Sequence, residues 1–229
     1  MQGKLITVFG GGGFLGRYVA QALLSQGARL RIACRNANSA NHIKPLGNLG
    51  QVQLMEADIR KSASVKRAVM DADAVVNLVG SFADMDAVQN IGAGIVAQAA
   101  ADAGVGALVH ISAIGADVDS DAVYGRSKGA GEAAVLAAFS TAMILRPSVI
   151  FGTEDQFFNR FAAMSRMGPL LPVVGAETRF QPVHVDDVAQ AAVKGVLGQA
   201  HGVYELGGPE VATFRALMGK MLGIIRRRR

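Results

Sequence analysis

The chain has 229 residues, of which 51% are hydrophobic and 18% charged, a composition typical of one folded α/β domain. This composition excludes a disordered, fibrous or repeat protein. The single cysteine, Cys34, excludes an internal disulfide framework and fits a reducing compartment, so we expect a cytoplasmic location. No apolar run reaches the roughly 18 residues of a membrane span, and the first residues show no secretory-signal pattern.

The net charge of +5 does not by itself indicate nucleic-acid binding, because four arginines form the terminal run Arg226–Arg229. Without that run the charge is nearly balanced, and we expect no nucleic-acid partner. No acidic residue precedes Glu56, whereas the same stretch holds Lys4, Arg17, Arg29, Arg31, Arg35 and Lys44. A basic first quarter suits an anionic ligand, and a solvated basic surface accounts for it equally well.

Apolar runs alternate with helical patterns along the first two thirds of the chain. The pattern predicts strands over residues 4–10, 28–35, 51–58, 73–80, 105–115 and 141–152, and helices over residues 14–27, 62–72, 85–104 and 121–139. The strands are nearly continuous in Val, Ile and Leu, as expected when a parallel sheet is covered on both faces. We therefore predict an α/β fold, a doubly wound Rossmann-type sheet in three α/β/α layers.

This alternation breaks after Gly152, where a polar-aromatic helix, "EDQFFNRFAAMSRM", leads into a loop. We predict that residues 1–152 form a dinucleotide-binding core. Residues 153–229 then form a small C-terminal annex that faces a substrate or a partner and does not fold alone. Its aromatic residues Phe157, Phe158 and Phe161 either close the cleft, meet a partner or line a pocket for an apolar substrate.

The stretch "VFGGGGFLGR" places Gly10, Gly13 and Gly16 between the first strand and the first helix, in the context of a dinucleotide-binding loop. The first glycine permits a tight turn, the second lets backbone amides approach a pyrophosphate, and the third lets the helix pack closely on the strand. The amides at the helix start, including those of Phe14 and Leu15, then face the negative charge. The alternative is a glycine-rich connection that binds no ligand.

The residue after the second strand separates NADP(H) from NAD(H), since NAD-preferring members of this fold carry a carboxylate there. Arg35 stands at that place, and a guanidinium suits a 2′-phosphate. We therefore predict that NADP(H) is preferred and NAD(H) possible; the alternative is a surface arginine, because strand ends are predicted only to within a residue or two.

The ends of the later strands supply the remaining predicted cofactor contacts. Asp58 and Ile59, after the third strand, flank the adenine ring, or Asp58 only caps a turn. Val79 and Gly80 end the fourth strand, and Pro147 ends the sixth on the nicotinamide side.

The stretch "YGRSK" places Tyr124 and Lys128 four residues apart, on one face of a helix. A nearby ammonium favours the phenolate, which lowers the tyrosine pKa and makes the side chain a usable acid/base. Ser112, at the end of the fifth strand, lies close by as a partner for a substrate oxygen. These three residues are the predicted catalytic set.

Several motifs together resemble the short-chain dehydrogenase/reductase superfamily, in its extended and atypical branches that include NAD-dependent epimerases and dehydratases. They are "GGGGFLG", "ADIR", "RPSVIFG", "PVHVDDVAQA" and the Ser112, Tyr124 and Lys128 set. The resemblance covers almost the whole chain. It implies that Tyr124 is the general acid/base, that Lys128 binds the nicotinamide ribose and tunes the tyrosine, and that Ser112 orients a carbonyl.

Longer stretches, among them "HIKPLGNLGQV" and "RPSVIFGTEDQFFNRFAAMSRMGPLLPV", further resemble the nucleotide-binding accessory subunits of respiratory complex I and their bacterial relatives. This resemblance implies tight NADP(H) binding, an accessory or assembly role in respiratory NADH dehydrogenase, and complex I subunits as partners. The intact Tyr124 and Lys128 pair keeps an alternative open. In it the protein is a soluble NAD(P)-dependent oxidoreductase or epimerase/dehydratase that transfers hydride to or from a carbonyl or hydroxyl, with Tyr124 as acid/base.

Two further features have competing explanations. The run Arg226–Arg229 either rests against anionic lipid, at the inner face of the cytoplasmic membrane, or is a solvated tail. His184, Asp186 and Asp187 lack a further His or Cys at ligand spacing, so we predict that Asp186 caps a helix and that there is no metal site. Cys34 and His110 are predicted core residues.

Overall fold

The computed structural model describes residues 1–168 and 170–227, so Arg228 and Arg229 of the terminal basic run lie outside the described residues. The elements are β1 (Leu5–Phe9), α1 (Phe14–Ser25), β2 (Arg29–Cys34), η1 (Ala37–Leu46), β3 (Val52–Glu56), α2 (Ser62–Val69), β4 (Ala74–Asn77), η2 (Asp86–Ile91), α3 (Gly92–Asp102), β5 (Ala107–Ile111), α4 (Val123–Ala138), β6 (Met143–Pro147), β7 (Ile150–Phe151), α5 (Phe158–Met164), β8 (Arg179–Phe180), β9 (Val183–His184), α6 (Val185–Val196), β10 (Gly202–Leu206), β11 (Ala212–Thr213) and α7 (Phe214–Ile224).

Seven strands form one sheet in the order β10-β6-β5-β4-β1-β2-β3, and every neighbouring pair is parallel. The predicted doubly wound sheet is confirmed. The strand order reverses beside β1, which pairs with β2 on one side and β4 on the other. In open parallel sheets the crevice at such a reversal, at the carboxyl ends of the strands, is where ligands bind.

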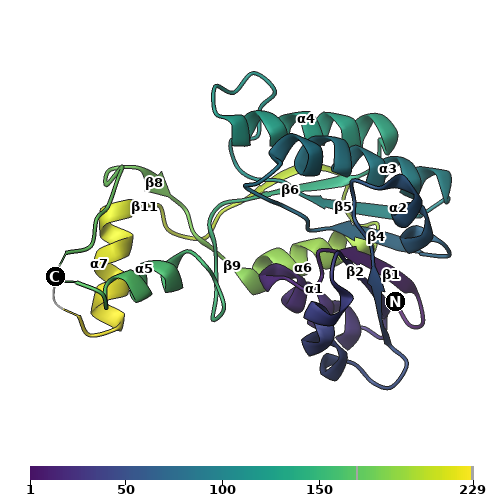
Figure 1. Ribbon diagram of the computed structural model, residues 1–229, viewed down its shortest axis with the longest axis horizontal. Coiled ribbons are helices and arrows are strands. Elements are labelled where there is room, and N and C mark those ends of the chain that lie inside the picture. Colours follow the sequence, from purple (N-terminus) through teal and green to yellow (C-terminus); the bar gives the residue numbers. More distant parts are fainter. Residues whose placement is uncertain (169, 228–229) are drawn as a thin grey trace.

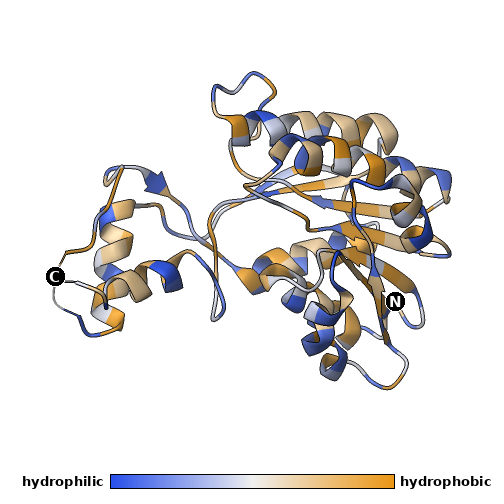
Figure 2. Ribbon diagram, in the orientation of Figure 1, coloured by the Kyte–Doolittle hydropathy of each residue, from blue (hydrophilic) through white to orange (hydrophobic). Residues whose placement is uncertain are grey.

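Helices cover both faces of this sheet (Figure 1). Helices α1 and α6 pack together on one face, and α2, α3 and α4 cover the other. Hydrophobic residues lie along the strands and on the helices that cover them (Figure 2), and β1, β4 and β5 are buried at every residue. Such strands need apolar cover on both sides, which explains why the sequence alternates strands with amphipathic helices.

The structure departs from the expected boundary after Gly152, because α6 and β10 return to the core. Helix α6 packs against α1, and β10 extends the sheet in register with β6, from Gly202 beside Met143 to Leu206 beside Pro147. This strand is separated from β6 by more than fifty residues, so no local alternation marks it as the seventh strand. We use "annex" below for residues 156–168, 170–181 and 208–227, which form the smaller body in Figure 1.

The annex is built from α5, α7 and the two-stranded antiparallel sheet β8–β11. Its centre is a group of aromatic rings, in which Phe214 lies 5.7 Å from Phe157, 5.2 Å from Phe161 and 5.8 Å from Phe180 between centroids. Phe157 and Phe161 thus stabilise the annex itself. Among the described helices, none combines the length and the apolar character needed to cross a bilayer.

The helix cap predicted for Asp186 belongs to another residue. His184 is the N-cap of α6, and its Nδ1 accepts a hydrogen bond from the Asp186 amide at 3.4 Å. Asp186 and Asp187 lie in the first turn instead, where their charges are stabilised by the helix dipole.

Candidate functional site

The glycine loop joins β1 to α1 at the reversal point of the sheet. Gly10 has φ +75°, a left-handed conformation that favours glycine. A Cβ on Gly16 would collide with the backbone of Gly11, so α1 can approach the loop only with glycine there. Gly13 is the N-cap of α1 and has no side chain to satisfy the amides of the first turn. The loop therefore presents bare backbone amides beside an open space.

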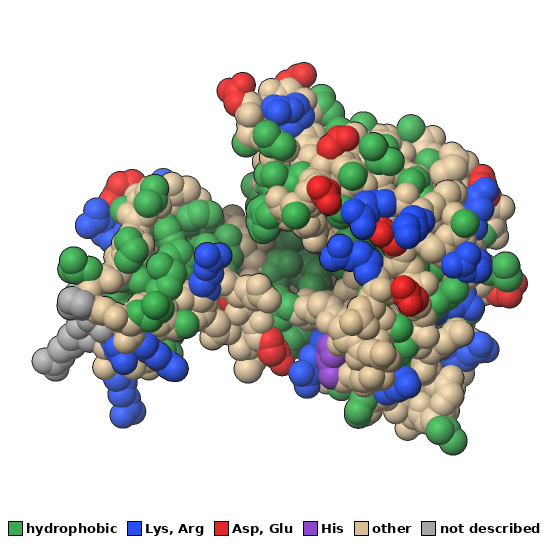
Figure 3. All heavy atoms as spheres, viewed as in Figure 1, with side chains coloured by type: hydrophobic (Ala, Val, Ile, Leu, Met, Phe, Trp, Pro, Cys, Tyr) green, Lys and Arg blue, Asp and Glu red, His purple; other side chains and the backbone are tan. Residues whose placement is uncertain are grey.

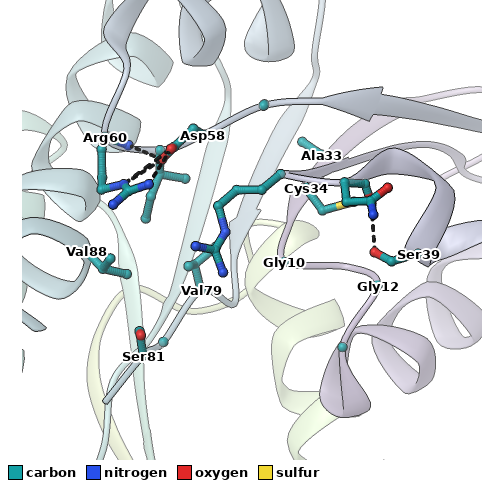
Figure 4. A pocket seen from close by; sticks show the side chains of 16 residues that line it. Gly10, Gly12, Ala33, Cys34, Ser39, Asp58, Arg60, Val79, Ser81 and Val88 are labelled. Carbon is teal, nitrogen blue, oxygen red and sulfur yellow. Dashed lines mark hydrogen bonds and ion pairs between the residues drawn. The ribbon is translucent and has the colours of Figure 1, made fainter. Parts of the chain in front are cut away.

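That space is a cavity of about 340 Å³ at the carboxyl ends of the strands (Figure 4). Seven of the residues predicted from the sequence line it: Gly10, Gly13, Arg35, Asp58, Ile59, Val79 and Gly80. The other predicted residues lie outside its lining: Phe14, Leu15, Gly16, Ser112, Tyr124, Lys128 and Pro147. The cavity thus corresponds to the adenosine and phosphate side of the predicted site, while the predicted catalytic set is beyond its wall.

Several lining residues were not predicted: Gly12, Ala33, Cys34, Asn36, Ser39, Ala57, Arg60, Ser81 and Val88. Cys34 was predicted in the core, but it ends β2 at the cavity and is only partly buried. Ser39 was missed because it reaches the cavity from η1, a segment with no recognised pattern. Arg60 could have been found, because it closes the "ADIR" motif directly after Asp58.

The end of β2 presents a cation to the cavity. Arg35 is exposed, follows β2 directly and has no ion pair or hydrogen bond from its guanidinium within the described part of the chain. Ser39 lies across the cavity from Asp58 and Arg60 (Figure 4), and its hydroxyl donates to the carbonyl of Asn36 at 2.7 Å. A free guanidinium can bind a phosphate.

At the opposite end, Asp58 is held by Arg60 (Figure 4). Nε of Arg60 donates to Oδ1 at 3.0 Å and Nη2 to Oδ2 at 2.7 Å, and these bonds lower the pKa of Asp58 to about 2. The Arg60 amide also donates to Oδ1 at 3.0 Å. Asp58 therefore caps a turn, which was the alternative to contact with the adenine ring, and it also lines the cavity.

Lys128 lies behind the wall formed by Gly80. It is 4% exposed, and its Nζ lies 3.8 Å from the position that a Cβ would take on Gly80. Nζ donates to the carbonyl of Ile111 at 3.1 Å. Burial lowers the pKa of Lys128 to about 8, so the ammonium is held in a place that disfavours its charge.

Tyr124 lies one turn before Lys128 on α4, and its ring stacks on Phe82 with centroids 5.3 Å apart. Burial raises the pKa of Tyr124. The predicted lowering of this pKa by Lys128 is therefore wrong, because desolvation dominates and the ammonium donates to a backbone carbonyl instead. Tyr124 is a neutral phenol at physiological pH, able to donate a proton or a hydrogen bond.

Near this helix the core contains polar atoms without partners. Ser112 is 4% exposed at the end of β5, and its Oγ has no hydrogen-bond partner in the described residues. Gln89 donates from Nε2 to the carbonyl of Ser81 at 2.9 Å, while its Oε1 is equally unpartnered there. Buried polar groups are rarely left unsatisfied, so each such atom needs an explanation.

His110 is a core residue, as predicted, and is 1% exposed. Nδ2 of Asn77 lies 3.2 Å from Nδ1 of His110, and Oδ1 of Asn77 accepts from the Val79 amide at 3.1 Å. Burial lowers the pKa of His110 to about 3, so the ring is neutral. The pair fixes the backbone at Val79, where β4 meets the cavity.

The remaining predicted residues support this geometry from outside the cavity. The ring of Phe14 meets Tyr18 at 5.7 Å, Leu15 packs against the core, and the carbonyl of Pro147 accepts from the Ile114 amide at 3.2 Å. They hold the first turn of α1 and the end of β6 in place.

A sequence profile described as the NAD-dependent epimerase/dehydratase family matches residues 6–207. Among curated proteins, the chain is 38% identical to the mitochondrial NADH dehydrogenase (ubiquinone) 1 alpha subcomplex subunit 9 of Arabidopsis thaliana, over 99% of this chain and 59% of the relative. It is 39% identical to the subunit of that name from Mus musculus, over 84% and 53%. The 40 kDa subunit of mitochondrial NADH-ubiquinone oxidoreductase from Neurospora crassa is 34% identical over 92% and 57%. The chain thus spans little more than half the length of these relatives.

Solved structures bear out the fold. A dTDP-glucose 4,6-dehydratase from Bacillus anthracis, in complex with NAD, superposes with a TM-score of 0.86 at 17% identity over 99% of this chain and 82% of the dehydratase. The enzyme WbmH of Bordetella bronchiseptica, in complex with NAD+, gives 0.80 at 22% identity over 97% and 82%. At such identities the likeness is one of fold.

The expected location, in the cytoplasm or at the inner face of the cytoplasmic membrane, is wrong, because the complex I relatives of this chain are mitochondrial proteins. A reducing compartment does not specify the cytoplasm, so the single cysteine could not make that distinction.

Proposed function

We propose a function on one established premise: the chain belongs to the NAD-dependent epimerase/dehydratase family. In our proposal, it binds NADP(H) and acts as an accessory or assembly component of respiratory NADH dehydrogenase, in which the bound dinucleotide stabilises the fold. Complex I subunits are its partners. The observation that carries this proposal is the 38% identity to a complex I subunit over 99% of the chain.

The cavity residues fit a dinucleotide. The left-handed Gly10 and the close contact at Gly16 leave the loop amides free of side chains, which suits a pyrophosphate at the start of α1. Arg35 offers a cation to a 2′-phosphate, and no carboxylate ends β2 to bind a free ribose hydroxyl. NADP(H) is therefore preferred. When bound, the nicotinamide supplies hydride-transfer chemistry.

Contact with an anionic membrane belongs to the same proposal. Arg226 is exposed after the end of α7, and Arg227 donates from Nη1 to the carbonyl of Ser165 at 2.7 Å. A basic residue near an anionic lipid surface contributes about 1 kcal/mol.

A second function is favoured by one observation, the unpartnered hydroxyl of Ser112. In an oxidoreductase or epimerase/dehydratase, this hydroxyl donates to a substrate oxygen and Tyr124 transfers the proton. The raised pKa of Tyr124 suits proton donation to a carbonyl better than proton removal from a hydroxyl.

Assembly and turnover can be separated in cells that lack the protein. We expect the tagged wild-type chain to co-migrate with complex I on native gels and to restore the level of assembled complex. Tyr124→Phe should restore it equally, because the phenol hydroxyl is not needed for assembly. Failure of the wild-type chain to co-migrate, or loss of assembly in Tyr124→Phe with NADPH binding intact, would contradict the accessory role.

The cofactor preference has a separate test. Arg35→Ala should weaken NADPH binding at least about tenfold, because a charge-assisted contact to phosphate is lost, and should leave NADH binding unchanged. Titration calorimetry with both nucleotides measures the ratio. An unchanged ratio would show that Arg35 does not read the 2′-phosphate.

A further inference from the structure

A second cavity, larger than the one at the glycine loop, opens where the annex joins the core. Its volume is about 480 Å³, within the roughly 300–1,000 Å³ typical of small-molecule pockets. Residues of α5 and α7 line it, together with Phe151 and Gly152. Hydrophobic side chains gather on the face of the annex that looks toward the core (Figure 3).

The walls of this cavity are mostly apolar. Aromatic and aliphatic side chains come from both helices, chiefly Phe158 and Ala162 from α5 and Leu217, Met221 and Ile224 from α7. Water gains few hydrogen bonds in such a space, whereas an alkyl chain replaces water there with favourable burial.

The charged groups at this cavity are already compensated. Oδ1 of Asp155 accepts from the Phe158 amide at 2.6 Å, and Oδ2 lies 3.4 Å from the Gly152 amide. Lys220 and Glu210 form an ion pair at 2.6 Å, and both are more than half exposed. The wall therefore holds no free charge, and its rim presents a cation and an anion side by side.

We propose that the annex cavity binds the alkyl chain of a single-chain zwitterionic amphiphile, whose head group lies at the Lys220–Glu210 pair. The paired charges of the rim complement a head group that carries both signs, and they disfavour a head group of one sign. Ile224 lines the cavity and is 82% exposed, so the chain enters beside the end of α7. This ligand site goes beyond the proposed function and does not rest on it.

The amphiphile has two possible sources, a free molecule or a bilayer. Dodecylphosphocholine, kept below its critical micelle concentration, tests the shared chemistry by titration calorimetry and native mass spectrometry. We expect one equivalent to bind to the full chain. Absence of binding would overturn the proposal.

Two neighbouring alanines of α5 provide a matched pair of variants. Ala162→Phe fills the cavity and should weaken binding at least about tenfold, since the space for two or more methylenes is lost. Ala163→Phe adds the same ring at an exposed position outside the lining and should change binding less than twofold. Equal effects of the two variants would overturn the assignment.

A labelling experiment keeps the test decisive where Ala162→Phe does not fold, which NADPH binding and thermal unfolding would reveal. A dodecylphosphocholine analogue with a diazirine on its chain should label peptides from residues 158–164 and 214–224. Labelling concentrated elsewhere would contradict the site. Flotation with phosphatidylcholine vesicles identifies the source. If the wild-type chain floats and Ala162→Phe does not, the ligand comes from a bilayer. If the wild-type chain binds the detergent but does not float, the ligand is a free molecule.

Discussion

The helices of the core and of the annex differ in the room beside their glycines. In the core, a Cβ on Gly16, Gly129 or Gly131 would collide with backbone atoms of a neighbouring segment. In annex helix α7, a Cβ on Gly219 or Gly223 would meet nothing within 4 Å. The core therefore fixes the glycine loop and α4 by contacts between backbones, which tolerate almost no change. The annex has space around its helices, and its surfaces are free to meet a ligand or a partner.

Ion pairs differ between the two regions in the same way. Glu132 on α4 is 5% exposed and accepts two short hydrogen bonds from Arg146, at 2.9 and 2.7 Å. Glu210 and Lys220 in the annex are equally close but largely exposed. A buried carboxylate depends on its partner, whereas an exposed one is hydrated when the partner is lost.

The largest expected effect is that of Gly16→Ala. The added methyl would overlap the backbone of Gly11, and neither segment can move without displacing β1 or α1. We expect the free energy of unfolding to fall by about 3 kcal/mol and NADPH binding to be lost. Urea unfolding and calorimetry measure the two quantities. If the free energy of unfolding of the variant lies within 0.5 kcal/mol of the wild-type value, which is about a twofold change in the unfolding equilibrium constant, the loop is adaptable.

Lys128→Met tests whether a charged ammonium is buried in the core, through the dependence of stability on pH. The pKa of Lys128 is about 8 in the folded chain against a reference value of 10.5, so the unfolded chain binds more protons between these values. Stability of wild type relative to the variant should be nearly constant well below pH 8 and rise by about 3 kcal/mol as the pH passes from 8 to 10.5. Chemical unfolding at several pH values measures it. A difference that stays flat, or falls, across that window would contradict the buried ammonium.

Glu132→Gln should cost about 2 kcal/mol, because it leaves the Arg146 guanidinium in a partly buried place without its counter-charge. Glu210→Gln makes the same chemical change in the annex and should cost about 0.5 kcal/mol or less. Thermal and urea unfolding of both variants give the comparison. Equal losses would mean that the two ion pairs are equally important and that the contrast between the regions does not extend to charge.

What the sequence could predict follows from the range of the interactions involved. The glycine loop and the Val-rich strands are local patterns, so the sheet and Gly10 at its turn were predictable. Strand β10 was not, because its partner β6 lies far back in the chain and "GVYEL" carries no mark of that pairing. The boundary expected after Gly152 failed for this reason.

The chemistry of the site was predictable as far as residue types, and less so for their environment. Spacing placed Tyr124 and Lys128 on one helix. Whether the pKa of Tyr124 is raised or lowered depends on burial and on the Ile111 carbonyl, which accepts the hydrogen bond from the Lys128 ammonium. Likewise, Arg35 was found because it follows a strand, whereas Ser39 reaches the cavity from a segment with no recognised pattern. The local sequence predicts where a residue lies on a helix or strand, but not which distant residues surround it.

The only expected gain is that of Gly219→Ala in the annex. The position is inside α7, has ordinary helical backbone and faces open space, so a methyl is accommodated without contact. Alanine restricts the unfolded chain more than glycine does, and we expect the free energy of unfolding to rise by about 0.5–1 kcal/mol. Urea unfolding measures this gain beside the loss in Gly16→Ala. Since both substitutions add one methyl to a helical glycine, opposite signs would trace the difference to the surroundings alone, and a loss at Gly219 would mean that this face of α7 is already covered.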